Sequence, residues 1–104
     1  MTLYSVGEWD VKPGREDEFA AKWRELTELS LAEIEPDARV ILLRDREQPR
    51  RFHSIGEFRN GETIVDSQDG CVLGGRLGDL AGLLEQAQLS TLDVVDMIGD
   101  IRLR

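Results

Sequence analysis

The sequence predicts one α+β domain in which four antiparallel strands form a single sheet and helices cover one of its faces. Segments of alternating polarity, typical of strands, are interspersed with segments whose apolar residues recur every three or four positions, as in amphipathic helices. Turn-forming residues separate these segments. A chain of 104 residues has room for one hydrophobic core, so we assign residues 1–104 to a single domain.

The first two elements have the clearest signals. Residues 3–11 alternate loosely as a strand, and Lys12-Pro13-Gly14 ends it with a turn. Three acidic residues then open a helix that ends near Pro36. Negative charge stabilises a helix start, and a residue before proline disfavours the helical conformation. One face of this helix is marked by residues spaced three and four apart: Phe19, Trp23, Leu26, Ser30 and Ile34.

The later elements follow from shorter patterns. Residues 39–44 contain four consecutive apolar side chains, typical of a strand buried on both faces, and residues 51–59 alternate after a turn. The predicted order is β-α-β-β-α-β, which is the ferredoxin-like arrangement. The elements expected beyond Asn60-Gly61 are a short helix at 62–69, a glycine-rich stretch at 70–82, a helix at 79–88 and a long final strand at 91–103.

The predicted sheet carries apolar side chains on both faces, although its helices can cover only one. At least three of the four strands carry apolar residues at both their odd-numbered and their even-numbered positions, which point to different faces. A face open to water should instead be polar, and a large exposed apolar patch is rare on a monomer. We therefore expect a homodimer, in which a second copy related by a two-fold axis covers the free face. The long final strand could also pair with the partner's edge.

Charge and composition exclude several classes of protein. The formal charge of −8 argues against nucleic acid or an acidic membrane as partner, since both attract basic proteins. No apolar run approaches the roughly 20 residues that cross a bilayer, and the N-terminus lacks a secretory signal, so we expect a cytoplasmic protein. Cys71 is the only cysteine, which leaves no intramolecular disulfide and no cysteine-based metal site.

Five arginines lie within 16 positions, from Arg44 to Arg59, around the turn at Gln48-Pro49. Acidic residues interrupt the cluster, which favours a solvated hairpin tip. The alternative is a rim of guanidinium groups that binds an anionic ligand or the acidic residues of a partner subunit.

The first strand leads into the first helix through Val6-Gly7-Glu8-Trp9-Asp10-Val11-Lys12-Pro13-Gly14-Arg15-Glu16-Asp17-Glu18-Phe19, followed by Trp23. This segment, with weaker matches at 43–52 and 91–95, resembles the antibiotic biosynthesis monooxygenase (ABM) family. The resemblance implies a dimeric α+β barrel, with an apolar cavity between the sheet and helices of each subunit. Some members oxygenate polycyclic phenols or quinols with O₂ and without metal or flavin, and others open the haem ring.

The catalytic residues of the family's known branches do not map onto this sequence. The branch that oxidises aromatic polyketides uses an Asn and a Trp near each other, whereas the only asparagine here, Asn60, falls in a predicted turn. The haem-degrading branch uses a helical His, whereas the only histidine, His53, falls on a predicted strand. We therefore assign no catalytic residue, metal or cofactor from the sequence.

Six residues are candidates for the wall of a cavity that binds a small apolar or aromatic molecule. Alternatively, the tryptophans and phenylalanines simply form the core, and the tyrosine lies at an interface. The histidine could face a neighbour or solvent, or it could accept a proton from a phenolic substrate, because its unperturbed pKa is about 6.5. The six are Tyr4, Trp9, Trp23, Phe52, His53 and Phe58.

Three functions follow as alternatives. The first is a cofactor-independent monooxygenase that acts on an aromatic or quinol-type molecule in a cavity between sheet and helices. The second is a non-catalytic dimeric module of the same fold that binds a small molecule. The third is haem degradation, against which the absence of a helical histidine argues.

Overall fold

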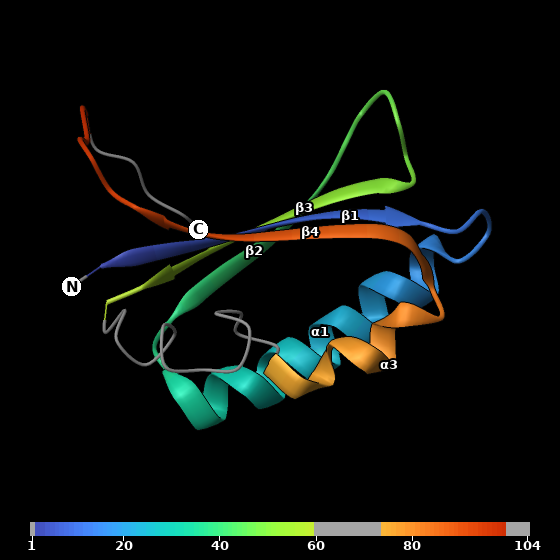
Figure 1. Cartoon of the computed structure of the whole chain (residues 1–104), viewed down its shortest axis with the longest axis horizontal. Coiled ribbons are helices and arrows are strands. Elements are labelled where there is room, and N and C mark those ends of the chain that lie inside the picture. The colour runs from blue at the N-terminus through green and yellow to red at the C-terminus, as the bar shows by residue number, and fades with distance from the viewer. Residues whose placement is uncertain (1, 60–73, 100–104) are drawn as a thin grey trace.

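The computed structural model describes residues 2–59 and 74–99 of the chain. Four strands form one antiparallel sheet in the order β2-β3-β1-β4. The described helices all pack on one side of this sheet (Figure 1). The elements are β1 (Leu3–Val11), α1 (Glu16–Ile34), β2 (Arg39–Arg44), β3 (Arg51–Phe58), the 3₁₀ helix η2 (Gly74–Leu77), α3 (Gly78–Ala81) and β4 (Leu84–Asp93).

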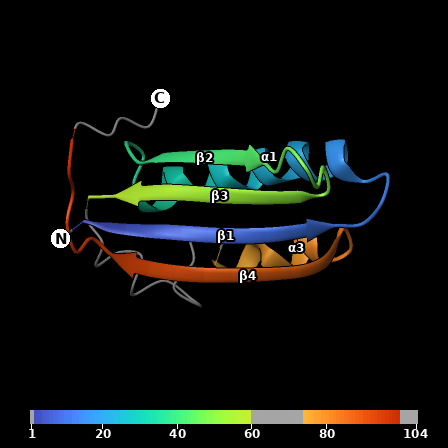
Figure 2. The ribbon, with the colours of Figure 1, turned by 90° about the horizontal axis from the view of Figure 1, so that it is seen from above.

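The sheet has one face that the described helices cover and one that they leave free. Figure 2 looks onto the free face, with α1 behind β2 and β3 and α3 behind β4. In β3 every second residue is buried, and these residues point toward the helices. β1 shows the same alternation at Gly7, Trp9 and Val11. The predicted α+β class with a four-stranded antiparallel sheet is therefore confirmed.

The first four predicted elements match the structure to within about one residue at each end, but the last helix and the last strand were misplaced. The helix expected at 79–88 is only the short α3, and the final strand begins at Leu84 rather than Thr91. β4 pairs with β1 from Val11↔Leu84 to Leu3↔Asp93, so pairing with a central strand outweighs the helical spacing of the leucines. The short helix expected at 62–69 lies outside the described residues.

Aromatic rings form the centre of the core between the sheet and α1. The Phe19 ring lies 5.7 Å from that of Trp9 and 5.1 Å from that of Phe52, each pair tilted by 47°. All three side chains are buried, as are Phe58 and Leu80. Such tilted contacts add to the stabilisation that comes from burying the rings. This cluster fixes α1 over β1 and β3.

Gly7 is required by the close packing of Trp9 against β3. The Trp9 indole N–H donates a hydrogen bond of 3.0 Å to the buried Ser54 hydroxyl. A Cβ at position 7 would lie 2.5 Å from the Ser54 oxygen and 2.7 Å from the Trp9 indole nitrogen. No larger side chain fits without displacing this pair.

We predict that Gly7→Ala lowers the free energy of unfolding by about 1–3 kcal/mol, the range for overpacked cores. Urea denaturation monitored by tryptophan fluorescence measures this loss. Gly78→Ala is the matched control, because a Cβ at that position meets nothing within 4 Å. Equal stability of the two variants would contradict the proposed tight fit around Trp9.

Candidate functional site

The structure divides the six candidate residues between the two faces of the sheet. Trp9, Phe52 and Phe58 point toward the helices and belong to the buried core, together with Trp23 of α1. Tyr4 and His53 point to the other face. Tyr4 is directly opposite Glu57 on β3, and His53 is directly opposite Glu8 on β1. The six side chains therefore do not line one common cavity.

Trp23 also borders a hollow on the helix side of the sheet. A groove of about 340 Å³ runs between α1 and the edge strand β2. Trp23, Leu31, Val40 and Leu42 supply its apolar walls. We call it the α1–β2 groove, and its lining residues are Ala20, Trp23, Arg24, Thr27, Glu28, Leu31, Val40 and Leu42.

Thr27 gives this groove its distinctive chemistry. Its side chain is only 4% exposed, and within the described part of the chain its hydroxyl has no hydrogen-bond partner. A buried polar group without a partner costs about 1–3 kcal/mol. A helical threonine splits between two χ1 rotamers, so a rotation can redirect the hydroxyl. A ligand in the groove could supply the missing partner.

Sequence reasoning did not select Thr27, although a signal for it was present. Thr27 follows Trp23 by four positions, so the two side chains lie on the same face of α1. A polar residue at a core-facing helical position is unusual. The neighbouring Ser30 is also a buried hydroxyl, and it donates a hydrogen bond of 2.9 Å to the Leu26 carbonyl of the same helix. Thr27 makes no such bond, which sets it apart.

Charged side chains lie at the mouth of the α1–β2 groove. Arg24 donates a hydrogen bond of 3.1 Å to Glu28, one helical turn further on, and both side chains are exposed. The pair leaves the groove with no net charge at its rim. A neutral, largely apolar ligand suits this arrangement better than an anion.

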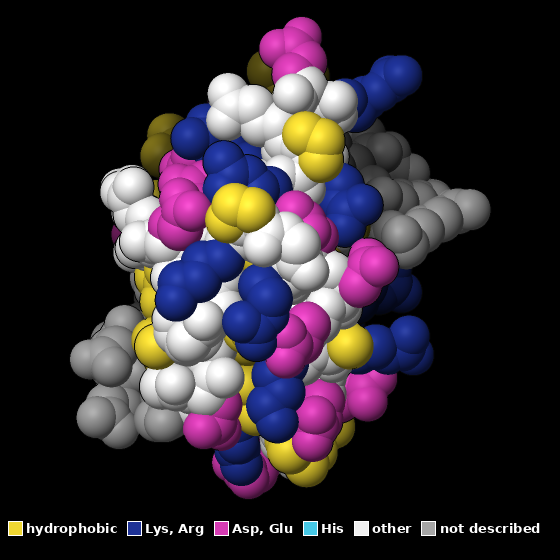
Figure 3. Space-filling model, turned by 90° about the vertical axis from the view of Figure 1, so that its right-hand side faces the viewer, with side chains coloured by type: hydrophobic (Ala, Val, Ile, Leu, Met, Phe, Trp, Pro, Cys, Tyr) yellow, Lys and Arg dark blue, Asp and Glu magenta, His cyan; other side chains and the backbone are white. Residues whose placement is uncertain are grey.

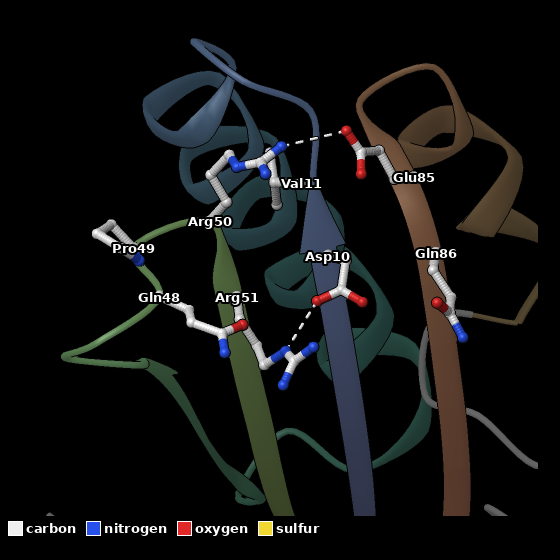
Figure 4. A pocket seen from close by; sticks show the side chains of 8 residues that line it. All are labelled: Asp10, Val11, Gln48, Pro49, Arg50, Arg51, Glu85 and Gln86. Atoms are coloured by element: carbon white, nitrogen blue, oxygen red, sulfur yellow. Dashed lines mark hydrogen bonds and ion pairs between the residues drawn. The ribbon is translucent and has the colours of Figure 1, made fainter.

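A second hollow of about 590 Å³ lies at the end of the sheet where β1 finishes and β4 begins (Figure 4). Its two guanidinium groups are each paired within the chain. Arg51 bonds to Asp10 at 3.0 Å, and Arg50 bonds to Glu85 at 3.2 Å. The hydrogen bond to Asp10 raises the pKa of Arg51. Three of the five arginines of the predicted cluster thus lie within 4.0 Å of a carboxylate, Arg44 being paired with Asp17, which weakens the case for an anionic ligand.

The hairpin tip beside this hollow is itself well ordered by one carboxylate. Asp45 accepts backbone N–H hydrogen bonds from Glu47 at 2.8 Å and Gln48 at 2.9 Å. Both hydrogen bonds lower the pKa of Asp45, and the bond from Gln48 has the larger effect. Figure 3 shows this end of the molecule, where acidic and basic side chains are interspersed. It has the mixed charge of an ordinary solvated surface.

The face of the sheet away from the helices, which we call the open face, combines an apolar centre with charges at both ends. Ile55 is directly opposite Ile41 on one side and Val6 on the other. Tyr4 donates a hydrogen bond of 3.3 Å to Glu57, and burial and then this carboxylate raise the Tyr4 pKa. The open-face residues are Tyr4, Val6, Glu8, Asp10, Arg39, Ile41, Leu43, Arg51, His53, Ile55, Glu57, Gln86, Gln88, Ser90 and Leu92.

Two classes of site receive no support from the described residues. Among them, no three histidine, cysteine or acidic side chains gather closely enough to hold a metal ion. No helix in residues 2–59 and 74–99 is long and apolar enough to cross a membrane. Asn60 and Cys71 lie outside the described residues.

The fold and groove define a ferredoxin-like α+β protein with an apolar hollow under its long helix. Residues 2–71 match the model of the antibiotic biosynthesis monooxygenase family, and the chain belongs to this family. The resemblance seen between Val6 and Phe19 is thereby confirmed. Comparison with curated protein sequences gives no significant match.

Several solved structures share the fold. SnoaB, a cofactor-independent oxygenase from Streptomyces nogalater, superimposes with a TM-score of 0.72 at 18% identity, over 95% of this chain and 98% of SnoaB. A Nitrosomonas europaea protein named for the same family gives 0.72 at 15% identity, over 94% of each chain. One from Bordetella bronchiseptica gives 0.67 at 17%, over 90% of this chain and 97% of its own. At such identities the likeness establishes the fold.

Proposed function

We propose that this protein binds a small, flat and largely apolar molecule in the α1–β2 groove. The observation that carries the proposal is the unpaired Thr27 hydroxyl beside the Trp23 ring. Ligand sites combine apolar walls with a few polar groups that orient the ligand. A polycyclic phenol or quinol offers both a large apolar surface and a hydroxyl or carbonyl that can bond to Thr27.

The reaction we propose for such a ligand is oxygenation by O₂ without a metal or flavin. Family membership supports this reaction, and SnoaB, which shares the fold, is described as a cofactor-independent oxygenase. With an anthrone-type substrate, a CH₂ group would become a carbonyl that takes one oxygen atom. The second oxygen atom would leave as water with the two hydrogens.

Binding without turnover is the second candidate function. Deprotonating a phenol or an anthrone requires a base, and general bases act within hydrogen-bond reach of the proton. Glu28 is the one carboxylate among the described residues that line the groove, and it is exposed and paired with Arg24. His53 lies on the opposite face of the sheet. This arrangement favours a module that binds its ligand and leaves it unchanged.

Oxygen uptake and binding, measured on the same sample, separate the two candidates. With 1,8-dihydroxyanthrone as the probe, tryptophan fluorescence reports binding and an oxygen electrode reports turnover above the uncatalysed rate. Binding with uptake supports the oxygenase, and binding without uptake supports the module. The absence of saturable binding would contradict the α1–β2 groove as a ligand site.

We predict that Thr27→Val weakens binding of this probe by about threefold to tenfold, the loss expected for one hydrogen bond. Valine keeps the shape of threonine but lacks its hydroxyl. The free protein should be as stable as the parent or more so, because an unpaired buried hydroxyl is removed.

Fluorescence titration and urea denaturation measure the two effects of Thr27→Val. Thr27→Ser is the matched control, since serine retains the hydroxyl and should retain more of the affinity. Equal affinity of the valine variant and the parent would exclude a polar role for Thr27.

We also propose that a second copy of the chain covers the open face. The apolar centre at Val6, Ile41 and Ile55 supports this proposal, since no described helix covers it. Charge supports it further. The open face carries two arginines and three acidic residues, whereas the chain as a whole has a net charge of −8. Two copies therefore repel each other less at this face than the net charge of the whole chain implies.

A further inference from the structure

An irregularity in the strand pairing shapes the hollow of about 590 Å³ at the end of the sheet. The last residue of β1 is opposite the first residue of β4, and Asp10, the residue before it on β1, is opposite Gln86. Glu85 is therefore an extra residue with no partner on β1. Such a β-bulge redirects side chains, and bulges are frequent beside functional sites. Glu85 and Gln86 both line the hollow, although adjacent residues of a regular strand point to different faces.

Two ion pairs span the hollow side by side. Arg51 donates a hydrogen bond of 3.0 Å to Asp10 on the neighbouring strand, and Arg50 donates one of 3.2 Å to Glu85 across the end of β1 (Figure 4). The charges of these four lining side chains cancel. A guanidinium group has five N–H donors, and a carboxylate can accept several hydrogen bonds. Each pair uses few of them, so it fixes the side chains in place and still offers donors and acceptors to a ligand.

The backbone beside the hollow is held by further hydrogen bonds. The Arg50 carbonyl accepts a bond of 2.9 Å from the Val11 N–H, and the Gln48 carbonyl accepts one of 2.8 Å from the Arg51 N–H. Gln48 and Gln86 line the hollow from opposite sides (Figure 4), and their amides are neutral donors and acceptors. A polar ligand therefore meets groups that are already positioned, which reduces the ordering cost of binding.

We propose that this hollow is a second ligand site, which binds a neutral polyhydroxyl molecule of the size of a pyranose sugar. An ion pair presents donors and acceptors next to each other. One hydroxyl of a vicinal diol can accept from the arginine while its neighbour donates to the carboxylate. A pyranose carries several such diols, which suits two ion pairs. An anion would have to displace the carboxylates, and a cation would have to displace the guanidinium groups.

This site is separate from the α1–β2 groove. None of the described residues that line the hollow also lines the groove. The groove has apolar walls, whereas the hollow is lined mainly by charged and amide side chains. Its volume lies in the range of sites that bind small molecules. The proposal therefore goes beyond the function proposed for the groove and does not depend on it.

Titration of ¹⁵N-labelled protein with the methyl glycosides of glucose, galactose and mannose tests the site. We expect at least one of them to cause saturable shifts of the Gln48 and Gln86 side-chain amide signals. A dissociation constant in the millimolar range is expected for a ligand held by a few exposed hydrogen bonds. The same glycoside with every hydroxyl methylated is the control ligand, since it keeps the ring but donates no hydrogen bond. It should bind at least about fivefold more weakly.

Removing one ion pair tests the same assignment on the protein. The double substitution Arg50→Ala and Glu85→Ala leaves the net charge unchanged and removes an exposed pair, so the fold should persist. The affinity for the responding glycoside should fall at least about fivefold, because hydrogen bonds to two charged groups are lost. Lys22→Ala with Glu25→Ala is the matched control. It removes an exposed ion pair of α1, away from the hollow, and should leave the affinity unchanged.

The proposal is overturned if none of the three glycosides causes saturable shifts, or if the methylated glycoside binds as tightly as its parent. It is also overturned if the double variant at Arg50 and Glu85, shown to be folded by circular dichroism, binds the glycoside as tightly as the unmodified protein. Tighter binding of acetate than of every glycoside would make the hollow an anion site instead.

Discussion

Replacing Ile55 with aspartate is expected to separate the proposed pair, raising its dissociation constant about 100-fold or more. Ile55 lies at the centre of the open face, directly opposite both Val6 and Ile41. An aspartate there would be buried without a partner against the apolar centre of the second copy, which costs several kcal/mol per ion. In the separated chain the same carboxylate faces water. The fold itself should therefore tolerate the change.

Sedimentation equilibrium measures the dissociation constant, and far-ultraviolet circular dichroism checks that the variant remains folded. Ala81→Asp is the control, because this substitution adds the same charge at an exposed position of α3, on the helix side of the sheet. A folded Ile55→Asp variant that stays dimeric would place the contact between copies elsewhere.

Phe19→Ala is expected to lower the free energy of unfolding by about 3–5 kcal/mol. Phe19 is fully buried and contacts the rings of both Trp9 and Phe52. Its loss leaves a cavity at the centre of the aromatic cluster that fixes α1 on the sheet. Domains of this size are stabilised by about 5–15 kcal/mol, so the variant should be close to unfolding.

Urea denaturation with both fluorescence and circular dichroism measures the loss in Phe19→Ala. Leu29→Ala on the same helix is the control, and because Leu29 is exposed the change should stay within about 0.5 kcal/mol. A loss below about 1 kcal/mol for Phe19→Ala would mean that α1 is held to the sheet by other contacts. The position of the α1–β2 groove would then need another explanation.

Local patterns predicted the first half of the fold because local signals and tertiary packing agree there. Lys12-Pro13-Gly14 ends β1 and begins the turn into α1, and Gly14 adopts a positive φ of 78°, which glycine favours. The leucines from Leu80 to Leu84 fit a helical period, but Gly82 follows the end of α3, and Leu84 enters the sheet beside Val11. The spacing of apolar residues within a short segment cannot predict that the segment pairs with a strand more than 70 positions away in the sequence.

The candidate site was predictable only in part. Aromatic residues identify a core and a cavity wall equally well, and the structure places Trp9, Phe52 and Phe58 in the core and Trp23 at both. The alternation of β1 and β3 already placed Tyr4 and His53 on one face of the sheet and Trp9 and Phe52 on the other, since neighbouring residues on a strand point to different faces. The unpaired state of Thr27 depends on every group around it, and no sequence pattern reports that.

The most direct test of the central proposal is a map of the ligand contact on the protein in solution. Amide chemical shifts of ¹⁵N-labelled protein, recorded during titration with 1,8-dihydroxyanthrone, locate the bound molecule. We predict saturable shifts concentrated at residues 20–31 of α1 and 40–42 of β2, and their marked reduction in Thr27→Val. Saturable shifts that leave these segments unchanged would contradict the α1–β2 groove as the binding site.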